Sequence, residues 1–474
     1  MALSDILTSL PSVAKPDRRL GFKEKIKWTA ITLIVFYILG EVTLFGLQKG
    51  PTGNIFGELQ IILASQFGTL ITLGIGPIVR SSIIIQLLSG AGVLKFDMKS
   101  PEGKATYMGA QKVLAIAFTL FEGGILVYSG QLPVDPGLAS SIGVGSANFL
   151  LLFQILLGGI IIIYLDEIVS KWGFGSGISL FIAAGVSMEI AWRALSPLID
   201  IGGKAAWIGQ GPLIGAIPNF VSKFEFIRSP SLAVGQNDML AVTATIIVFV
   251  VTMYAQSIKV EVPISYGRIA GFARRYPLPF IYASNMPVIF ISALIANLRF
   301  WVAILQNSGV SFLGTIDSSG IAHGPIRYIL PYGTLAKDVI LGLPVNVLHG
   351  VVYFSVLVLG SILFSKLWVS VSGMDAASLS DKLSEAGMQI PGFRSDPRVI
   401  EKILNRYVPY LTVMGGAFVG ALSAGADFTG ALGSGTGILL TVGIIYHLYE
   451  EIAREQVLEM HPAIRSFIGE GGVF

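Results

Sequence analysis

The chain has no cysteine, and only 13% of its 474 residues are charged. Without thiols it can form no disulfide, no thiolate nucleophile and no cysteine-ligated metal site, and its four histidines argue against a histidine-based one. The charged share is about half of that in soluble proteins, whereas 53% of the residues are hydrophobic and the mean hydropathy is +0.73. We therefore expect a polytopic membrane protein, not a soluble enzyme, a disordered chain or a nucleic-acid-binding domain. The net charge of +3 does not by itself indicate a polyanionic partner.

Residues 1–27 contain no apolar core of the length that a cleavable signal peptide needs, so we expect none there. Their lysines and arginines predict a cytoplasmic N-terminal segment. Ile6, Leu7 and Leu10 would share one side of a short helix, which suits a helix on the membrane surface. A frayed tail is the alternative.

Ten segments are apolar enough to cross a bilayer as helices, which must satisfy their backbone hydrogen bonds internally because lipid offers no partner. Six of them are clear, and four are interrupted by glycine, proline or charge. The clear segments are Trp28–Leu47, Val113–Tyr128 (with an earlier start as the alternative), Phe149–Leu165, Met239–Ile258, Asn346–Val371 and Leu439–Leu448 with its flanks. The interrupted segments are Leu70–Leu88, Phe174–Leu195, Leu278–Leu305 and Val408–Ala424.

Lysine and arginine set the predicted orientation. They are concentrated in the N-terminal segment and in the loops after the second, sixth and eighth spans, and such loops remain on the cytoplasmic side. The loops 259–279 and 366–406 and the tail 454–474 are therefore predicted to be cytoplasmic. Both chain termini then lie on that side, as an even number of spans requires.

Ten spans divide naturally into an N-terminal half, 28–235, and a C-terminal half, 236–453. Because five is odd, the second half would enter the membrane inverted, and spans two and seven would be equivalent. Both are interrupted, and paired broken spans point to a translocation path at the interface of the repeats. No residue-level identity between the halves is visible, so this division follows from topology.

Several intramembrane features allow two interpretations. The apolar segment Ile55–Phe67 is too short to span and could be a buried core helix or a re-entrant one. Ile75 and Val79 share a helix face, as do Ile178 and Ile182, and ordinary helix packing would explain both pairs. Arg80 and Glu122 are charges inside spans, which are usually functional. They could pair if spans two and three are adjacent, or Arg80 could snorkel into water.

The two large cytoplasmic loops are longer than orientation alone requires, so they could be arms that dock on a partner. Arginines beside aromatic residues suit RNA or another phosphate-rich surface, although acidic lipid headgroups would serve as well. No nucleophile–base pair or metal-ligand cluster is visible. The glycine-rich segment 173–179 lacks the Gly-Lys-Ser/Thr ending of a phosphate-binding loop. We therefore expect neither an enzyme nor a cofactor.

Three long motifs resemble those of the SecY family, whose members are the main subunit of the protein-conducting translocation channel. They are TLITLGIGPIV at 69–79, YLDEIVSKWGFGSGISLF at 164–181 and GSGTGILLTVGIIYHLYEE at 433–451. The resemblance covers essentially the whole chain and is closest to the archaeal branch. It implies an all-α polytopic membrane protein with ten transmembrane helices in two inverted five-helix halves around a central pore.

The resemblance also implies roles for particular residues. An aliphatic ring at the waist of the pore would consist of Ile75, Val79, Ile178, Ile182, Ile289 and Leu440. A re-entrant plug helix near 55–67 would close the pore with Ile55, Phe56, Leu59, Ile62, Leu63 and Phe67. Spans two and seven would form a lateral gate with a polar cluster of Arg80, Glu122 and Asn297. Archaeal relatives can have threonine at position 80, so the arginine is a departure.

The implied partners are the small membrane subunits SecE and Sec-beta, the ribosome with a nascent chain or signal sequence, indirectly the signal recognition particle receptor, and membrane lipids. The ribosome-docking candidates are Arg268, Arg274, Arg275 and Arg394. The implied location is the cell membrane. The rival class is a secondary transporter, which also uses inverted repeats but needs convergent polar groups at the midplane, where this sequence has isoleucines. A membrane-embedded enzyme would need a catalytic pair.

Overall fold

The computed structural model describes residues 11–18, 20–48, 64–90, 93–94, 96, 100–201, 204–206, 213–223, 239–262, 265–266, 275–307, 311–317, 322–333, 335–385, 388–389 and 397–460. The chain divides into two compact units, 1–185 with 447–474 and 186–446. These boundaries fall inside two helices, α8 (Gly177–Leu195) and α16 (Gly435–Met460). The predicted halves, 28–235 and 236–453, are a division by topology and stay a prediction.

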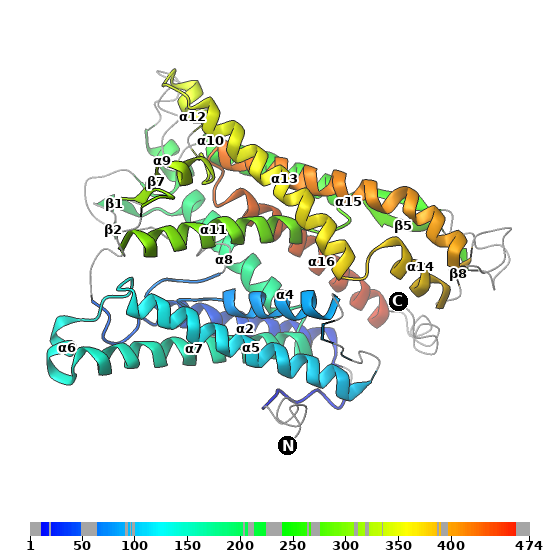
Figure 1. Cartoon of the computed structure of the whole chain (residues 1–474), viewed down its shortest axis with the longest axis horizontal. Coiled ribbons are helices and arrows are strands. Elements are labelled where there is room, and N and C mark those ends of the chain that lie inside the picture. Colours follow the sequence, from blue (N-terminus) through cyan, green and yellow to red (C-terminus); the bar gives the residue numbers. More distant parts are fainter. Residues whose placement is uncertain are drawn as a thin grey trace. The chain divides into compact units, whose positions relative to one another are not determined.

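The first unit is a group of long helices (Figure 1). α2 packs on α7, α4 on α5 and α5 on α7. Close contact between α5 and α7 depends on glycine, because a Cβ at Gly159 would lie 2.7 Å from the side chain of Thr119. Small residues allow such approach where lipid provides no hydrophobic drive for association. The helices of this unit are α2 (Phe22–Glu41), α4 (Gly76–Gly90), α5 (Pro101–Tyr128), α6 (Pro136–Ile142), α7 (Val144–Trp172) and the parts of α8 and α16 that it includes.

The second unit is built around the pair α13 and α15. A Cβ at Gly416 would lie 2.9 Å from that of Ser365, and one at Gly420 would lie 2.9 Å from the carbonyl oxygen of Leu357. The Ser365 hydroxyl donates to the carbonyl of Thr412 at 2.8 Å, so the two backbones nearly touch. The helices of this unit, besides its parts of α8 and α16, are α9 (Ala216–Lys223), α10 (Met239–Ser257), α11 (Met286–Asn307), η4 (Pro325–Tyr328), α12 (Leu335–Ile340), α13 (Val347–Val371), α14 (Ala376–Glu385) and α15 (Pro397–Phe428).

The strands of the second unit form four antiparallel pairs. β1 (Ile199–Ile201) pairs with β2 (Lys204–Ala206), and β6 (Thr315–Ile316) pairs with β7 (Ala322–His323). β3 (Lys259–Val262) pairs with β5 (Tyr276–Pro279), Lys259 opposite Pro279. β4 (Ser265–Tyr266) pairs with β8 (Met388–Gln389), Tyr266 opposite Met388.

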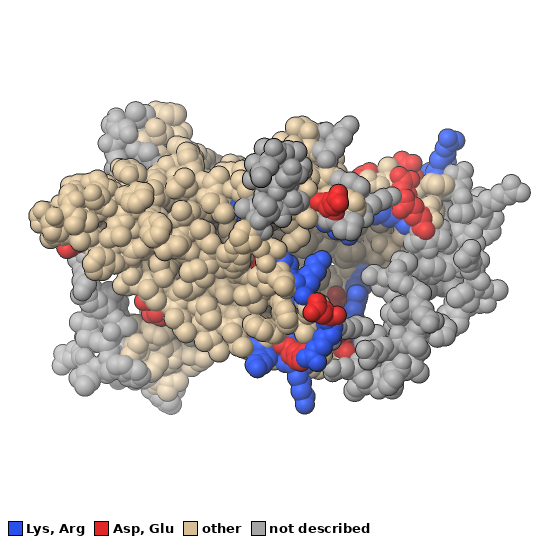
Figure 2. Space-filling view, turned by 90° about the horizontal axis from the view of Figure 1, so that it is seen from below, with Lys and Arg blue, Asp and Glu red and all other residues tan. Residues whose placement is uncertain are grey.

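Each of the ten predicted spans contains a helix. Within the described residues, six helical segments are long and apolar enough to cross a membrane, and two shorter apolar helices correspond to α4 and α11. Neither α2 nor α16 is among these helices. α2 carries charges near its ends, namely Lys23, Glu24, Lys25, Lys27 and Glu41, and α16 carries Glu450, Glu451, Arg454 and Glu455 in its C-terminal part. Charged side chains are scarce over most of the surface in Figure 2 and gather mainly on one part of it.

Three predicted boundaries were wrong. The first span was expected to reach Leu47, but α2 ends at Glu41 and Thr43 then forms a bridge with Thr69. The spans expected from Leu70 and Leu278 begin later, at Gly76 and Met286, because the turns before them break the helix. Of the predicted plug segment 55–67, residues 55–63 lie outside the described residues, and Phe67 lies half-buried in a turn.

Candidate pore and gate

The helices α4 and α11 begin with the same local structure. Two residues before each helix, Gly74 (φ 53°) and Ser284 (φ 56°) have left-handed backbone conformations, which are uncommon for a residue other than glycine. The amide of Gly74 donates to the carbonyl of Ile71 at 2.9 Å, and that of Ser284 to the carbonyl of Ile281 at 3.0 Å. Pro77 and Pro287 then follow as the second helical residues, where the missing N–H costs nothing.

This alignment places two of the predicted ring residues at corresponding positions. Val79 donates its amide to the carbonyl of Ile75 at 3.0 Å, and Ile289 donates to the carbonyl of Asn285 at 3.3 Å. Val79 is half-buried and Ile289 is buried. Position by position, Val79 therefore corresponds to Ile289, and Ile75 corresponds to Asn285.

The helices α8 and α16 also share their beginning, a Gly-Ser-Gly sequence at 175–177 and at 433–435. Gly175 (φ 67°) and Gly433 (φ 91°) have conformations that favour glycine. The carbonyl of the intervening serine accepts the first helical bond in both cases, 3.0 Å from Leu180 to Ser176 and 3.0 Å from Ile438 to Ser434.

In each case an aspartate of the preceding helix caps this start. Asp166 of α7 accepts the amide of Ile178 at 2.9 Å. Asp427 of α15 accepts the amide of Gly435 at 2.7 Å and also the hydroxyl of Tyr353 at 2.6 Å. A Cβ at Gly177 would lie 2.6 Å from the Cα of Asp166, so only glycine permits this approach. Carboxylates at helix N-termini satisfy otherwise unpaired amides and favour the helix dipole.

Aligned on the Gly-Ser-Gly sequence, Ile182 corresponds to Leu440, and both are buried. Ile178, which is half-buried, corresponds to Thr436. Two equivalent pairs of helix starts thus place four of the six predicted ring residues in two matched pairs, Val79 with Ile289 and Ile182 with Leu440.

The remaining two ring residues, Ile75 and Ile178, have polar counterparts in the second unit. There, Asn285 donates to the carbonyl of Leu439 at 2.9 Å. The hydroxyl of Thr436 lies 2.8 Å from that of Ser292 and 2.9 Å from that of Ser423. The bonds of Asn285 and Ser292 join the start of α11 to α16 over the turns that carry Ile289 and Leu440, so these two aliphatic residues lie on facing turns. The bond to Ser423 joins α15 to α16.

The predicted gate residues Arg80 and Glu122 form an ion pair between α4 and α5. Both side chains are partly buried, with exposed fractions of 24% and 14%. Asn297 lies on α11, where its amide donates to the carbonyl of Ala293 at 2.8 Å. The counterpart of Arg80 in the second unit is Phe290, whose ring packs against those of Phe364 and Trp368 on α13, at 5.7 and 5.5 Å between centroids.

The two predicted docking loops meet each other in the second unit through the β4–β8 pair. Behind them lies a buried apolar cluster that includes Leu278, Leu383 and Leu404. Of the candidate arginines, only Arg275 is described, and its exposed side chain lies 3.4 Å from Glu261. Arg268, Arg274 and Arg394 lie outside the described residues, as do Ile55, Phe56, Leu59, Ile62 and Leu63 of the predicted plug.

Comparison with known proteins gives three kinds of likeness. The family model described as SecY matches residues 69–449, and the model for the plug domain of Sec61p matches residues 34–68. The protein translocase subunit SecY of Methanothermobacter thermautotrophicus is 45% identical over 471 residues, 98% of both chains. A solved structure described as that of a protein conducting channel is 40% identical, covers 98% of this chain and 99% of its own, and has a TM-score of 0.77. Sec61 in the canine ribosome-channel complex from the endoplasmic reticulum is 38% identical with the same coverage and a TM-score of 0.75.

The fold is therefore that of an all-α, multi-pass membrane protein of the protein-conducting channel class. The chain belongs to the SecY family, over nearly its whole length. Its relatives are channel subunits, not enzymes.

Proposed function

We propose that this chain is the pore-forming subunit of a channel through which unfolded polypeptides cross the membrane, and from which membrane-protein spans leave sideways into lipid. The full-length likeness to translocase subunits supports this proposal. The observation that supports its residue-level form is the local repeat. The helix pairs α4 with α11 and α8 with α16 have corresponding starts, and at corresponding positions they carry aliphatic residues, Val79 with Ile289 and Ile182 with Leu440.

The six ring residues would supply the waist of the pore. A narrow apolar constriction excludes small ions by dewetting. Aliphatic side chains can part around any polypeptide and offer it no hydrogen bond, which suits passage without regard to sequence. The plug segment matched at residues 34–68 would close this path when no polypeptide is present.

The lateral gate would select apolar segments by partition. Apolar surface gains about 25 cal/mol per Å² on leaving water, so a signal sequence moves into lipid, whereas a polar stretch continues through the pore. The Arg80–Glu122 pair would hold the gate helix α4 to α5 until such a segment arrives.

Partners and location belong to the same proposal. One related structure is that of a channel bound to a ribosome. In this chain, the two loops that pair through β4 and β8, together with the apolar cluster that includes Leu278, Leu383 and Leu404, would form the docking surface for a ribosome. SecE, Sec-beta, the signal recognition particle receptor, a place in the cell membrane and cytoplasmic termini complete the proposal.

Because the chain has no cysteine, single cysteines can test the waist directly. We expect Ile75→Cys, Ile182→Cys and Ile289→Cys to crosslink to a polypeptide stalled during translocation. Ile34→Cys serves as a matched control, because Ile34 is 59% exposed on α2 and is not a ring position. Equal crosslinking at Ile34 and the ring positions, or none at the ring, would overturn the proposal and favour a transporter.

A further inference from the structure

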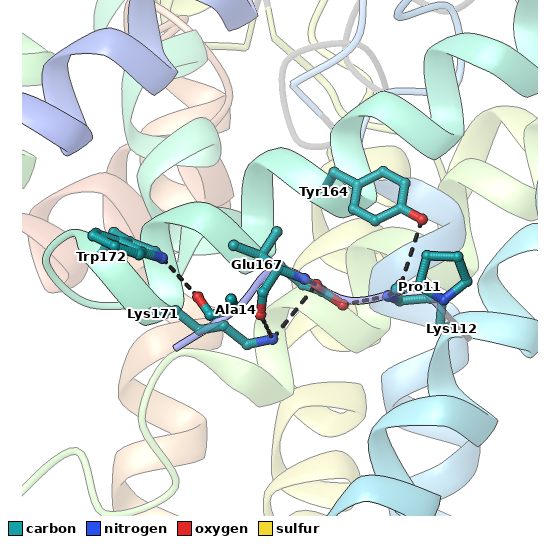
Figure 3. A network of polar contacts seen from close by, with 8 residues as sticks. Pro11, Ala14, Lys112, Tyr164, Glu167, Lys171 and Trp172 are labelled. Atoms are coloured by element: carbon teal, nitrogen blue, oxygen red, sulfur yellow. Dashed lines mark hydrogen bonds and ion pairs between the residues drawn. The ribbon is translucent and has the colours of Figure 1, made fainter. Parts of the chain in front are cut away.

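A short N-terminal segment, residues 11–14, lies against α5 at Lys112 and against the C-terminal end of α7, and is held there by its main chain (Figure 3). Val13 donates its amide to Glu167 at 2.8 Å and accepts from Lys171 at 2.6 Å. The carbonyl of Pro11 accepts from Lys112 at 2.7 Å, and that of Ala14 accepts from the Trp172 indole at 2.9 Å. We refer to residues 11–14 as the strap. Every one of these bonds uses a backbone atom of the strap, so the site binds the main chain of the strap and not its side chains.

The side chains that hold the strap form a charge cluster with surplus positive charge. Glu167 lies 2.5 Å from the Lys112 amine and 3.6 Å from the Lys171 amine, and the exposed fractions of all three are only 10–11%. The Lys112 amine also lies 5.0 Å from the centre of the Tyr164 ring. One carboxylate cannot satisfy two desolvated ammonium groups, and buried charges are costly unless they are paired and hydrogen-bonded. The strap carbonyls supply the missing acceptors.

The cluster joins three helices at one end of the first unit. Lys112 belongs to α5, and Glu167 and Lys171 belong to α7. Trp172 packs against Trp28 of α2 at 5.5 Å between ring centroids. Lys112 lies on the same helix as Glu122, about 15 Å away at 1.5 Å per residue. The strap therefore acts on the helix that presents the partner of Arg80.

We propose that the strap is a clamp that holds α5, at Lys112, against the C-terminal end of α7, and that Glu167 is its positioning residue. While the strap is docked, α5 keeps Glu122 in reach of Arg80, and the gate requires a strongly apolar signal sequence to open. When the strap is released, α5 is free to shift at Lys112 relative to α7, and weaker signal sequences are accepted. This inference rests on the proposed function for its consequence at the gate, but docking of the strap can be measured without it.

The first experiment measures docking. A spin label on Ser12→Cys, at an exposed position of the strap, reports the mobility of the strap in the full-length protein. We expect a restrained label in the parent and a mobile one in Glu167→Gln, which removes the charge that joins Val13, Lys112 and Lys171. Glu455→Gln is the matched control, because Glu455 forms a comparably buried ion pair with Lys25, 2.7 Å away, outside the strap. A label that is equally restrained in Glu167→Gln, or equally mobile in the parent, would overturn the clamp.

A second pair of variants tests recognition of the main chain. Val13→Pro removes the amide that Glu167 accepts, whereas Val13→Ala keeps it. We expect Val13→Pro to release the strap and raise the translocation of substrates with weakened signal sequences several-fold, with Val13→Ala and Glu455→Gln at the parent level. A mobile strap with unchanged signal selectivity would refute the clamp's action on the gate. Failure of the ring crosslinks would instead refute the proposed function and leave the docking result standing.

Discussion

The helix starts of the two units share a backbone and differ in chemistry. In the first unit, the corresponding positions of α4 and α8 carry Ile75 and Ile178. In the second unit, they carry Asn285 and Thr436. The Asn285 amide donates to the carbonyl of Leu439, and the Thr436 hydroxyl bonds to that of Ser292, so both residues link the start of α11 to α16. The positions that are aliphatic in both units, Val79 with Ile289 and Ile182 with Leu440, all belong to the proposed ring. The two units therefore share the backbone geometry of their helix starts but differ in side chains: the first unit has aliphatic residues where the second has hydrogen-bonding ones.

The same contrast recurs away from the ring. Arg80 reaches α5 through an ion pair with Glu122, whereas its counterpart Phe290 reaches α13 through aromatic packing. An ion pair between partly wet side chains can be opened and closed, but a packed aromatic cluster resists separation. This difference suggests that α4 is the more easily displaced of the two helices from its neighbour.

The caps of α8 and α16 should differ in strength, and the largest effect is expected at α16. Asp427→Ala would leave the Gly435 amide and the Tyr353 hydroxyl without an acceptor, at a cost of about 2–5 kcal/mol in the free energy of unfolding. Asp166→Ala would leave the Ile178 amide without its acceptor and remove a weaker interaction with the Gly177 amide, but would leave no hydroxyl unpaired, at about 1–3 kcal/mol. Thermal unfolding of the detergent-solubilised protein measures both. Adding Tyr353→Phe to Asp427→Ala should restore part of the loss, and equal losses for the two aspartates would contradict the comparison.

The ion pair at α4 should matter less for stability and more for selection. Arg80→Ala leaves Glu122 partly buried without its partner, at a cost near the low end of about 3–5 kcal/mol. It should loosen the closed gate and admit weaker signal sequences, which a translocation assay with graded signal sequences measures. Arg193→Ala, on α8, is the control for loss of an arginine. Unchanged selectivity in Arg80→Ala would mean that the pair does not hold the gate.

The smallest effect is expected at Thr436, where the second unit replaces an isoleucine by a hydroxyl. Thr436→Val keeps the shape but removes the group that Ser292 and Ser423 share, at about 1–2 kcal/mol. Thermal unfolding should show this loss. Thr412→Val, on α15, provides the comparison, because the Thr412 hydroxyl donates within its own helix, to the carbonyl of Val408 at 2.7 Å. A stability gain in Thr436→Val would show that the hydrogen bonds are dispensable.

Much of the fold could be predicted from the sequence, because long apolar runs in lipid have one solution, the helix. All ten predicted spans contain one, and the possible Arg80–Glu122 pair is present. The boundaries at Leu47, Leu70 and Leu278 could not be predicted, because turns with left-handed residues such as Ser284 look as apolar as helices do.

The repeat was also not visible in the sequence. At α4 and α11, Gly74 corresponds to Ser284 and Ile75 to Asn285, so what these two starts share is mainly backbone geometry. Only the prolines and the Gly-Ser-Gly sequences of α8 and α16 are shared as residues. The capping residues Asp166 and Asp427 were missed for the same reason. A signal for them was present, since each precedes a Gly-Ser-Gly sequence within about three helical turns. The ring itself remains a proposal.

The glycine and serine contacts between α13 and α15 limit how the second unit can move. With Gly416 and Gly420 against Ser365 and Leu357, the two helices interlock so closely that neither can slide or roll without lifting off the other. The two helices must therefore move as one rigid pair, and any rearrangement that admits a polypeptide has to occur in the segments that connect this pair to its neighbours. A larger residue at Gly420 would force α13 and α15 apart, because its Cβ would lie 2.9 Å from the carbonyl oxygen of Leu357.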